Sequence, residues 1–239
     1  MYGWRAKIGR ISPSPETVGA EEWRRAMPEG VCLVETRTMI QDVSAEGLAE
    51  AVTQVERAAR ELASAEVDVI LQAGTAIAFF RGVGHDSELC RRITAATGIK
   101  STTSFTAVAA AMNALGIKKP AIATAYIADI DARLAHVLNE SGFDVAVIRG
   151  MGLKRSPEMG RVPIAETYRF AKESARAAPQ ADGIFISCGN LRTFEAIEPL
   201  EADTGLPVVT SNQAGLWHAL RLAGISEHLP NLGRLLRAH

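Results

Sequence analysis

The sequence has little of what marks several classes of protein. Only 5% of its 239 residues are aromatic and the formal net charge is −1, so we expect no base-stacking or strongly basic surface for nucleic acid. No window approaches 18 uninterrupted apolar residues, and the first residues lack the apolar run of a signal peptide. We therefore expect neither nucleic acid nor a membrane as a partner. The residues do not predict an oligomeric state.

Cofactor and metal motifs are also missing. Cys32, Cys90 and Cys188 are an odd number of cysteines without metal-ligand spacing, and the five histidines are scattered. Residues 82–84 form only part of a glycine-rich dinucleotide loop, because the third glycine is absent. These patterns predict a protein of the reducing cytoplasm that uses no cofactor and no metal.

Short apolar strands alternate with helical stretches along the whole chain. We expect strands at 7–12, 30–36, 67–75, 99–103, 119–126, 144–149, 181–188 and 208–210. Helices are expected at 18–27, 44–65, 87–97, 104–115, 129–141, 165–178, 191–204 and 214–223, with a loop over 150–160. Alternation of this kind is typical of a parallel α/β sheet.

The two halves of the chain are a repeat. Residues 67–74 match 181–188 at an offset of 114, and residues 98–107 match 205–214. A repeat of about 110 residues predicts two pseudo-symmetric lobes, each a parallel sheet of about four strands flanked by helices. We assign residues 1–115 plus 214–239 to the first lobe and 116–213 to the second, with the active site in the cleft between them.

Gly74 and Cys188 occupy equivalent strand ends, and in parallel sheets such ends are where ligands bind. Gly189 lets the backbone approach a ligand closely. A thiol here can move a proton on or off carbon, provided that helix ends and N–H donors bring its pKa toward neutral. The alternative for Cys188 is a buried structural thiol, which is our interpretation of Cys32 and Cys90.

Hydroxyl groups follow the last strand of each half, at Thr103, Ser104, Thr210 and Ser211. Together with backbone N–H groups at loop-to-helix transitions they would form a receptor for a carboxylate. The same residue types also serve as ordinary helix N-caps. Both roles stay open for these four residues.

Four stretches carry a family resemblance: residues 74–82, 123–127, 187–189 and 205–224. They resemble the aspartate/glutamate racemase superfamily, and within it the branch of arylmalonate decarboxylase and maleate isomerase, over nearly the full length. Racemases and maleate isomerases of this superfamily carry a cysteine at both equivalent strand ends, whereas the decarboxylase keeps only the second. Gly74 and Cys188 resemble the decarboxylase pattern.

The resemblance implies a cofactor-independent decarboxylase-like lyase that acts on a disubstituted malonate or a similar small dicarboxylate. Cys188 would protonate an enediolate whose retained carboxylate is held, in an oxyanion hole, by Thr75, Tyr126 and nearby amides. Gly74 would be the bare strand end opposite the thiol. Residues expected to bind substrate are Gly189, Asn190, Ala76, Ile77, Ser14, Met159, Met39 and Val43.

Some positions depart from the decarboxylase pattern. Ala76 stands where the decarboxylase has a serine, and Asn190 replaces a glycine. Residues 13–17, 190–193 and 211–213 look more like the maleate isomerase and ectoine-utilisation relatives. Two alternatives therefore stay open: an isomerase or racemase that uses another group in place of the missing thiol, and a non-catalytic carboxylate-binding protein.

Overall fold

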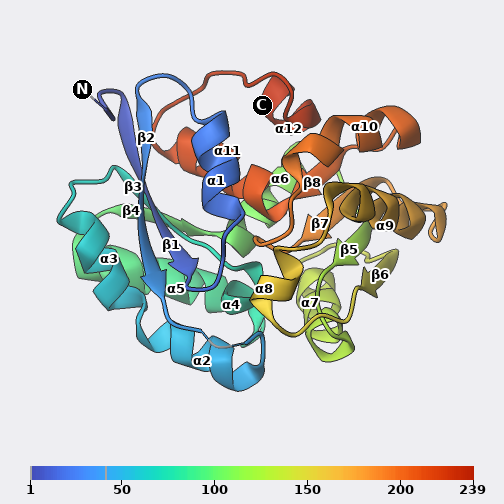
Figure 1. Cartoon of the computed structure of the whole chain (residues 1–239), viewed down its shortest axis with the longest axis horizontal. Coiled ribbons are helices and arrows are strands. Elements are labelled where there is room, and N and C mark those ends of the chain that lie inside the picture. Colours follow the sequence, from blue (N-terminus) through green and yellow to red (C-terminus); the bar gives the residue numbers. More distant parts are fainter. Residues whose placement is uncertain (1, 41) are drawn as a thin grey trace.

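The computed structural model describes residues 2–40 and 42–239, which form two α/β lobes lying side by side (Figure 1). The first lobe has a sheet with the order β2 (Val31–Thr38), β1 (Ala6–Pro13), β3 (Val69–Gln72) and β4 (Lys100–Thr103). The second has the order β6 (Val147–Gly150), β5 (Pro120–Thr124), β7 (Gly183–Ser187) and β8 (Val208–Thr210). All neighbouring strands are parallel. The predicted fold class is confirmed.

The two sheets share one strand order, so β3 and β7 are equivalent strands. Both are buried along their whole length, as expected for parallel strands covered by helices on both faces, and this explains their uninterrupted apolar sequences. Gly74 follows β3 and Cys188 follows β7. The repeat seen in the sequence therefore places these two residues at corresponding positions of the two lobes.

Helices cover both sheets. In the first half they are α1 (Gly19–Ala26), α2 (Ala45–Thr53), α3 (Val55–Ala63), α4 (Thr75–Phe79), α5 (His85–Thr97) and α6 (Ser104–Ala114). In the second half they are α7 (Ala128–Glu140), α8 (Ser156–Met159), α9 (Ile164–Arg176), α10 (Phe194–Thr204), α11 (Ser211–Leu222) and α12 (Gly233–Ala238). Buried apolar side chains of both halves form one connected core.

The helices α6 and α11 are equivalent in the repeat and pack against each other. Each begins with a threonine cap: the Thr103 hydroxyl accepts from the Thr106 N–H, and the Thr210 hydroxyl accepts from the Gln213 N–H. Such a cap is worth about 1 kcal/mol of stability. Since α11 contacts β3 and β4 as well as β8, the assignment of 214–239 to the first lobe stays a prediction.

Four elements differ from those expected. The strand predicted over 67–75 ends at Gln72, and residues 75–79 form the helix α4, which was not predicted. The single helix predicted over 44–65 is divided at Gln54, whose side chain exchanges hydrogen bonds with the backbone of Met39 at 2.9 and 3.1 Å. The predicted loop over 150–160 contains α8, where Pro157 takes the first turn of the helix, a position that proline tolerates. The helix α12 was not predicted.

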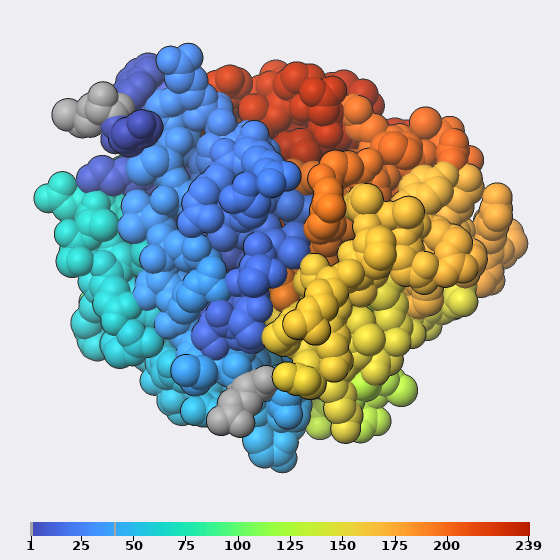
Figure 2. All heavy atoms as spheres, in the orientation of Figure 1, coloured from blue at the N-terminus to red at the C-terminus, as the bar shows by residue number. Residues whose placement is uncertain are grey.

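The lobes meet along a seam that crosses the molecule. In Figure 2 the blue N-terminal residues of the first lobe contact the yellow and orange residues of the second across this line. Within the described residues, no helix combines the length and apolar character that a membrane crossing requires.

Candidate active site

A cavity lies between the lobes, where the strands of both sheets end. The first lobe lines it with the segment after β1 (Pro13, Pro15, Glu16), with Ile40, Asp42, Val43 and Leu48, and with residues 74–77. The second lobe contributes Tyr126, two residues of α8 (Ser156 and Met159), and residues 188–190. The predicted convergence of the two strand ends is therefore present in the structure.

Cys188 is the sulfur group of this cavity. It is buried, and its thiol lies 3.6 Å from the sulfur of Met159. Burial raises the pKa of Cys188 to about 12, although the N–H groups of Asn190 and Leu191 lie near the sulfur and oppose that rise. A pKa near neutral was the condition given above for moving a proton both on and off carbon. That condition is not met, because the effect of desolvation on the charged sulfur outweighs that of the two N–H groups.

Gly74 occupies the opposite strand end. Its φ of +91° lies in the left-handed region, which side chains other than glycine rarely adopt. A Cβ atom here would also come within 3.0 Å of Ile77 and 3.2 Å of Pro13. The backbone at this end is therefore bare, and the thiol of the cavity lies on the side of β7.

Two hydroxyl groups lie between the strand ends. Thr75 is the first residue of α4, and its hydroxyl donates to the Ser211 hydroxyl at 2.8 Å. Tyr126 follows β5 and hydrogen-bonds to Thr75 and Ser187. Burial holds the pKa of Tyr126 well above 10, so its hydroxyl stays neutral and keeps its proton to donate.

Asn190 lines the cavity, but its amide is occupied by the protein. The side-chain oxygen accepts from the N–H groups of Thr17 at 2.9 Å and Val18 at 3.1 Å. Its nitrogen donates to the carbonyl and hydroxyl oxygens of Ser156 at 2.7 and 3.0 Å. Asn190 thus ties the segment after β1 and the helix α8 to the turn that carries Cys188.

The remaining predicted residues divide into two groups. Gly189, Ala76, Ile77, Met159 and Val43 line the cavity, as expected. Ser14 and Met39 do not: the Ser14 hydroxyl accepts from the Ile40 N–H at 3.2 Å, and Met39 is 55% exposed. Prolines on both sides of Ser14 line the cavity in its place, because the chain turns at residues 14–15 and directs the Ser14 hydroxyl to Ile40.

The hydroxyl set that could have formed a carboxylate receptor serves mainly as helix caps. Thr103 and Thr210 accept hydrogen bonds from the first turns of α6 and α11. Neither these two residues nor Ser104 and Ser211 line the cavity. The capping interpretation is therefore confirmed for both threonines.

Glu16 also lines the cavity, although it was not among the predicted site residues. Its carboxylate is buried and pairs with the guanidinium of Arg10 at 2.5 Å. Burial raises the pKa of Glu16, while the charge and hydrogen bond of Arg10 oppose the rise. An acidic residue three positions after the end of a strand was the available signal. Its buried partner, however, lies six positions earlier on β1 and only becomes a neighbour in the fold.

Fold and site together define a two-lobed α/β protein in which one strand-end thiol faces a bare strand end across a cavity. A sequence profile described as arylmalonate decarboxylase matches residues 19–236. Arylmalonate decarboxylase of Bordetella bronchiseptica is 35% identical over 229 residues, covering 95% of each chain. Maleate isomerase of Nocardia farcinica is 28% identical over 208 residues, covering 84% of this chain and 82% of the isomerase.

The solved structures agree with these matches. A liganded double mutant of arylmalonate decarboxylase superimposes with a TM-score of 0.91 at 34% identity, covering 96% of this chain and 98% of that one. The chain belongs to the arylmalonate decarboxylase family. The family resemblance seen in the sequence is confirmed.

Proposed function

We propose that this protein is a cofactor-independent carboxy-lyase that removes one carboxyl group from a disubstituted malonate, arylmalonates included, or from a similar small dicarboxylate. The observation that carries the proposal is the unequal pair of strand ends in one cavity. A thiol that keeps its proton lies at the end of β7, and glycine backbone lies at the end of β3. One acid without an opposing base suits a reaction in which carbon dioxide leaves and a proton takes its place.

The reaction begins with the retained carboxylate held by the hydroxyls of Thr75 and Tyr126 and by the N–H groups at residues 188 and 189. To donate to the carboxylate, the Thr75 hydroxyl turns its proton away from Ser211. The bond between the α-carbon and the departing carboxylate breaks, and its electron pair delocalises into the retained carboxylate as an enediolate. Hydrogen-bond donors aimed at this growing charge stabilise the transition state. The thiol of Cys188 then protonates the α-carbon, and the resulting thiolate recovers a proton from solvent.

The walls of the cavity support loss of the second carboxylate. Ile40, Leu48, Ile77 and Met159 make much of its lining apolar, and among the described residues that line it none is lysine or arginine. A carboxylate without a counter-charge in such surroundings is poorly solvated. Leaving as neutral carbon dioxide removes that charge.

The raised pKa of Cys188 supports a role as an acid. At neutral pH the thiol holds its proton, while the enediolate carbon is a much stronger base and takes it. An isomerase that attacks maleate with a thiolate needs the opposite ionisation state. The resemblance implies that maleate isomerases place that thiolate at the position of Gly74, so the decarboxylase is the better supported function.

Phenylmalonate and maleate, each without added cofactor, distinguish the candidate functions. We expect carbon dioxide and phenylacetate from the first and no fumarate from the second. Fumarate without carbon dioxide would instead establish the isomerase, and binding without turnover would indicate a carboxylate-binding protein.

With 2-methyl-2-phenylmalonate, delivery of the proton from one side predicts a single enantiomer of the product. A racemic product would contradict Cys188 as the sole proton donor.

The three free cysteines support a cytoplasmic location for this activity. Cys32, Cys90 and Cys188 are all free thiols. A reducing compartment such as the cytoplasm preserves thiols of this kind.

A further inference from the structure

The peptide group between Gly189 and Asn190 is held at both of its polar ends. Its carbonyl oxygen, on Gly189, accepts from the side-chain nitrogen of Asn212 at 3.0 Å. Its N–H group, on Asn190, lies near the sulfur of Cys188 and lowers the pKa of that thiol. Because a peptide group is planar, whatever fixes the direction of the carbonyl also fixes the direction of the N–H.

Asn212 is itself held in place. It lies in the first turn of α11, is buried, and its backbone carbonyl accepts from the indole N–H of Trp23 at 2.9 Å. Its side-chain nitrogen also donates to a carboxylate oxygen of Glu22 at 2.7 Å. The Asn212 side chain therefore connects α1 to the turn that carries Cys188.

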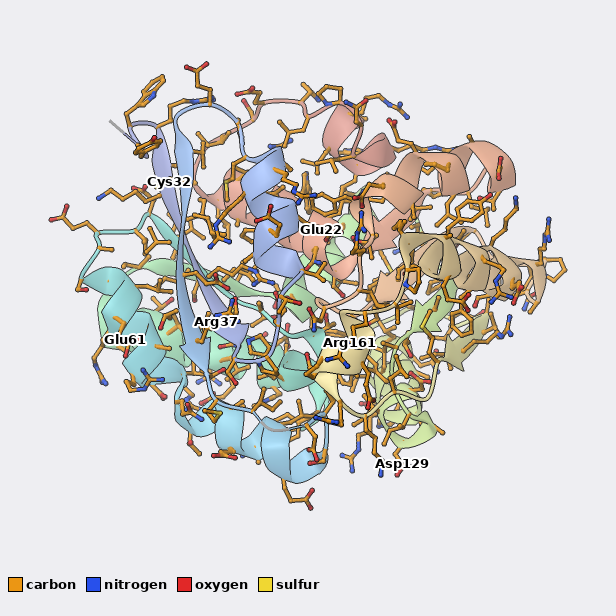
Figure 3. The ribbon with its side chains drawn as sticks, viewed as in Figure 1. Glu22, Cys32, Arg37, Glu61, Asp129 and Arg161 are labelled. Atoms are coloured by element: carbon orange, nitrogen blue, oxygen red, sulfur yellow. The ribbon has the colours of Figure 1, made fainter. Side chains whose placement is uncertain are left out.

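Glu22 also binds the chain a few residues after this turn. Its other carboxylate oxygen accepts from the N–H groups of Thr193 at 2.6 Å and Phe194 at 3.0 Å, where α10 begins. Glu22 is labelled in Figure 3 at the seam between α1 and the second lobe. The Glu22 carboxylate thus binds residues 193–194 directly, and through Asn212 it also holds Gly189 in the turn that carries Cys188.

We infer that Asn212 and Glu22 are positioning residues for Cys188: they orient the 189–190 peptide so that its N–H donates to the sulfur and stabilises the thiolate left after proton donation. Neither residue lines the cavity, so both act through the peptide. A hydrogen bond to a charged acceptor is stronger than one to a neutral acceptor, so this N–H favours the thiolate over the thiol. The role in turnover rests on the proposed function, whereas the effect on the sulfur does not.

The test measures the alkylation of Cys188 by iodoacetamide at one fixed pH near 8.5. It uses a Cys32→Ser, Cys90→Ser background in which Cys188 is the remaining cysteine. In that background, Asn212→Ala should slow alkylation roughly fivefold. Losing one charge-assisted hydrogen bond raises the thiol pKa by about 1–2 units, and the greater nucleophilicity of the remaining thiolate offsets part of the loss.

A purely structural role predicts the opposite sign, because a loosened turn exposes the sulfur and speeds alkylation. The matched control is Gln213→Ala, which removes a neighbouring buried side chain and the capping box of α11 without touching the turn. Alkylation of Asn212→Ala at or above the background rate, or equal slowing in Gln213→Ala, overturns the inference. If Asn212→Ala does not fold, Glu22→Gln replaces it in the test. We then expect alkylation to slow roughly twofold. An unchanged alkylation rate in Glu22→Gln would contradict the inference.

Turnover supplies a second readout. With phenylmalonate, Asn212→Ala should lower kcat while leaving KM within about twofold, since the N–H is needed most once the thiolate forms. A raised KM with unchanged kcat would contradict the positioning role. If the unmodified protein does not turn over phenylmalonate, the proposed function fails while the alkylation result still decides this inference.

Discussion

At the end of β3 the chain turns through Gly74 directly into α4, whereas at the end of β7 it passes through Cys188, Gly189 and Asn190 before α10 begins. These ends are equivalent in the repeat, and both line the same cavity. One end provides backbone and the Thr75 hydroxyl, the other a thiol held within a hydrogen-bonded turn. The comparison teaches that equivalent strand ends of a repeat can offer different groups to one cavity: the proposed proton donor lies at the end of β7 only, while donors to the retained carboxylate come from both ends.

Removal of the thiol is the strongest test of the difference between the two strand ends. Cys188→Ser should lose roughly 10³-fold in kcat with phenylmalonate, since a hydroxyl is a far poorer proton donor to carbon and acid–base groups contribute 10²–10⁴-fold. Release of carbon dioxide measures the loss. As controls, Cys32→Ser and Cys90→Ser should keep their activity, and equal losses in all three would remove the special role of Cys188.

On the β3 side, Thr75→Val removes one donor to the enediolate while conserving shape. We expect kcat/KM to fall roughly 10²-fold, the usual effect of losing one such donor. Thr94→Val, at a threonine of α5 that does not line the cavity, should leave turnover unchanged. Full activity in Thr75→Val would mean that the retained carboxylate is held elsewhere.

The buried carboxylate of Glu22 holds the chain after β7 and not the chain after β3. This difference should make the stability of the protein depend on pH. Burial raises the pKa of Glu22 from 4.5 to about 7. Between those two values the folded protein keeps a proton that the unfolded chain releases, so stability falls as pH rises through the window, by about 3 kcal/mol at most.

Urea unfolding at a series of pH values measures that slope, and Glu22→Gln should flatten it. Glu21→Gln, one residue earlier on α1 and exposed, is the matched control and should retain the slope. Identical slopes in the unmodified protein and in Glu22→Gln would assign the pH dependence to other groups.

The smallest effect concerns the pH dependence of turnover. With its pKa raised to about 12, the Cys188 thiol stays protonated across the usual assay range. We therefore expect kcat to change by less than about twofold between pH 7 and pH 10. An alkaline fall in kcat with an apparent pKa near 8 would show that the thiol ionises much more readily than its burial implies.

Local pattern was enough to predict the two lobes and the two strand ends. The stretches around Gly74 and Cys188 repeat at a constant offset, and buried parallel strands have short apolar sequences bounded by turn residues. The family resemblance, rather than local pattern, supplied most of the twelve residues expected in the site, and ten of the twelve line the cavity.

What could not be predicted depends on partners that are distant in the sequence. The helix break at Gln54 needs the backbone of Met39, and the buried charge of Glu16 needs Arg10. The pKa of Cys188 is set by how completely the surrounding chain excludes water, which a single sequence does not express. Asn190 is the clearest case: its position in the site was predicted, but its role of tying together three segments was not.

The amide of Asn190 has a consequence for how ligands enter. Its hydrogen bonds tie residues 17–18 and the helix α8 to the turn that carries Cys188. A wide separation of the lobes on that side would therefore break several buried hydrogen bonds each time a ligand entered. We expect ligands to enter instead through small displacements of the Val43 and Met159 side chains, which line the cavity. Entry and exit would then be fast and local, leaving the frame around the sulfur intact from one turnover to the next.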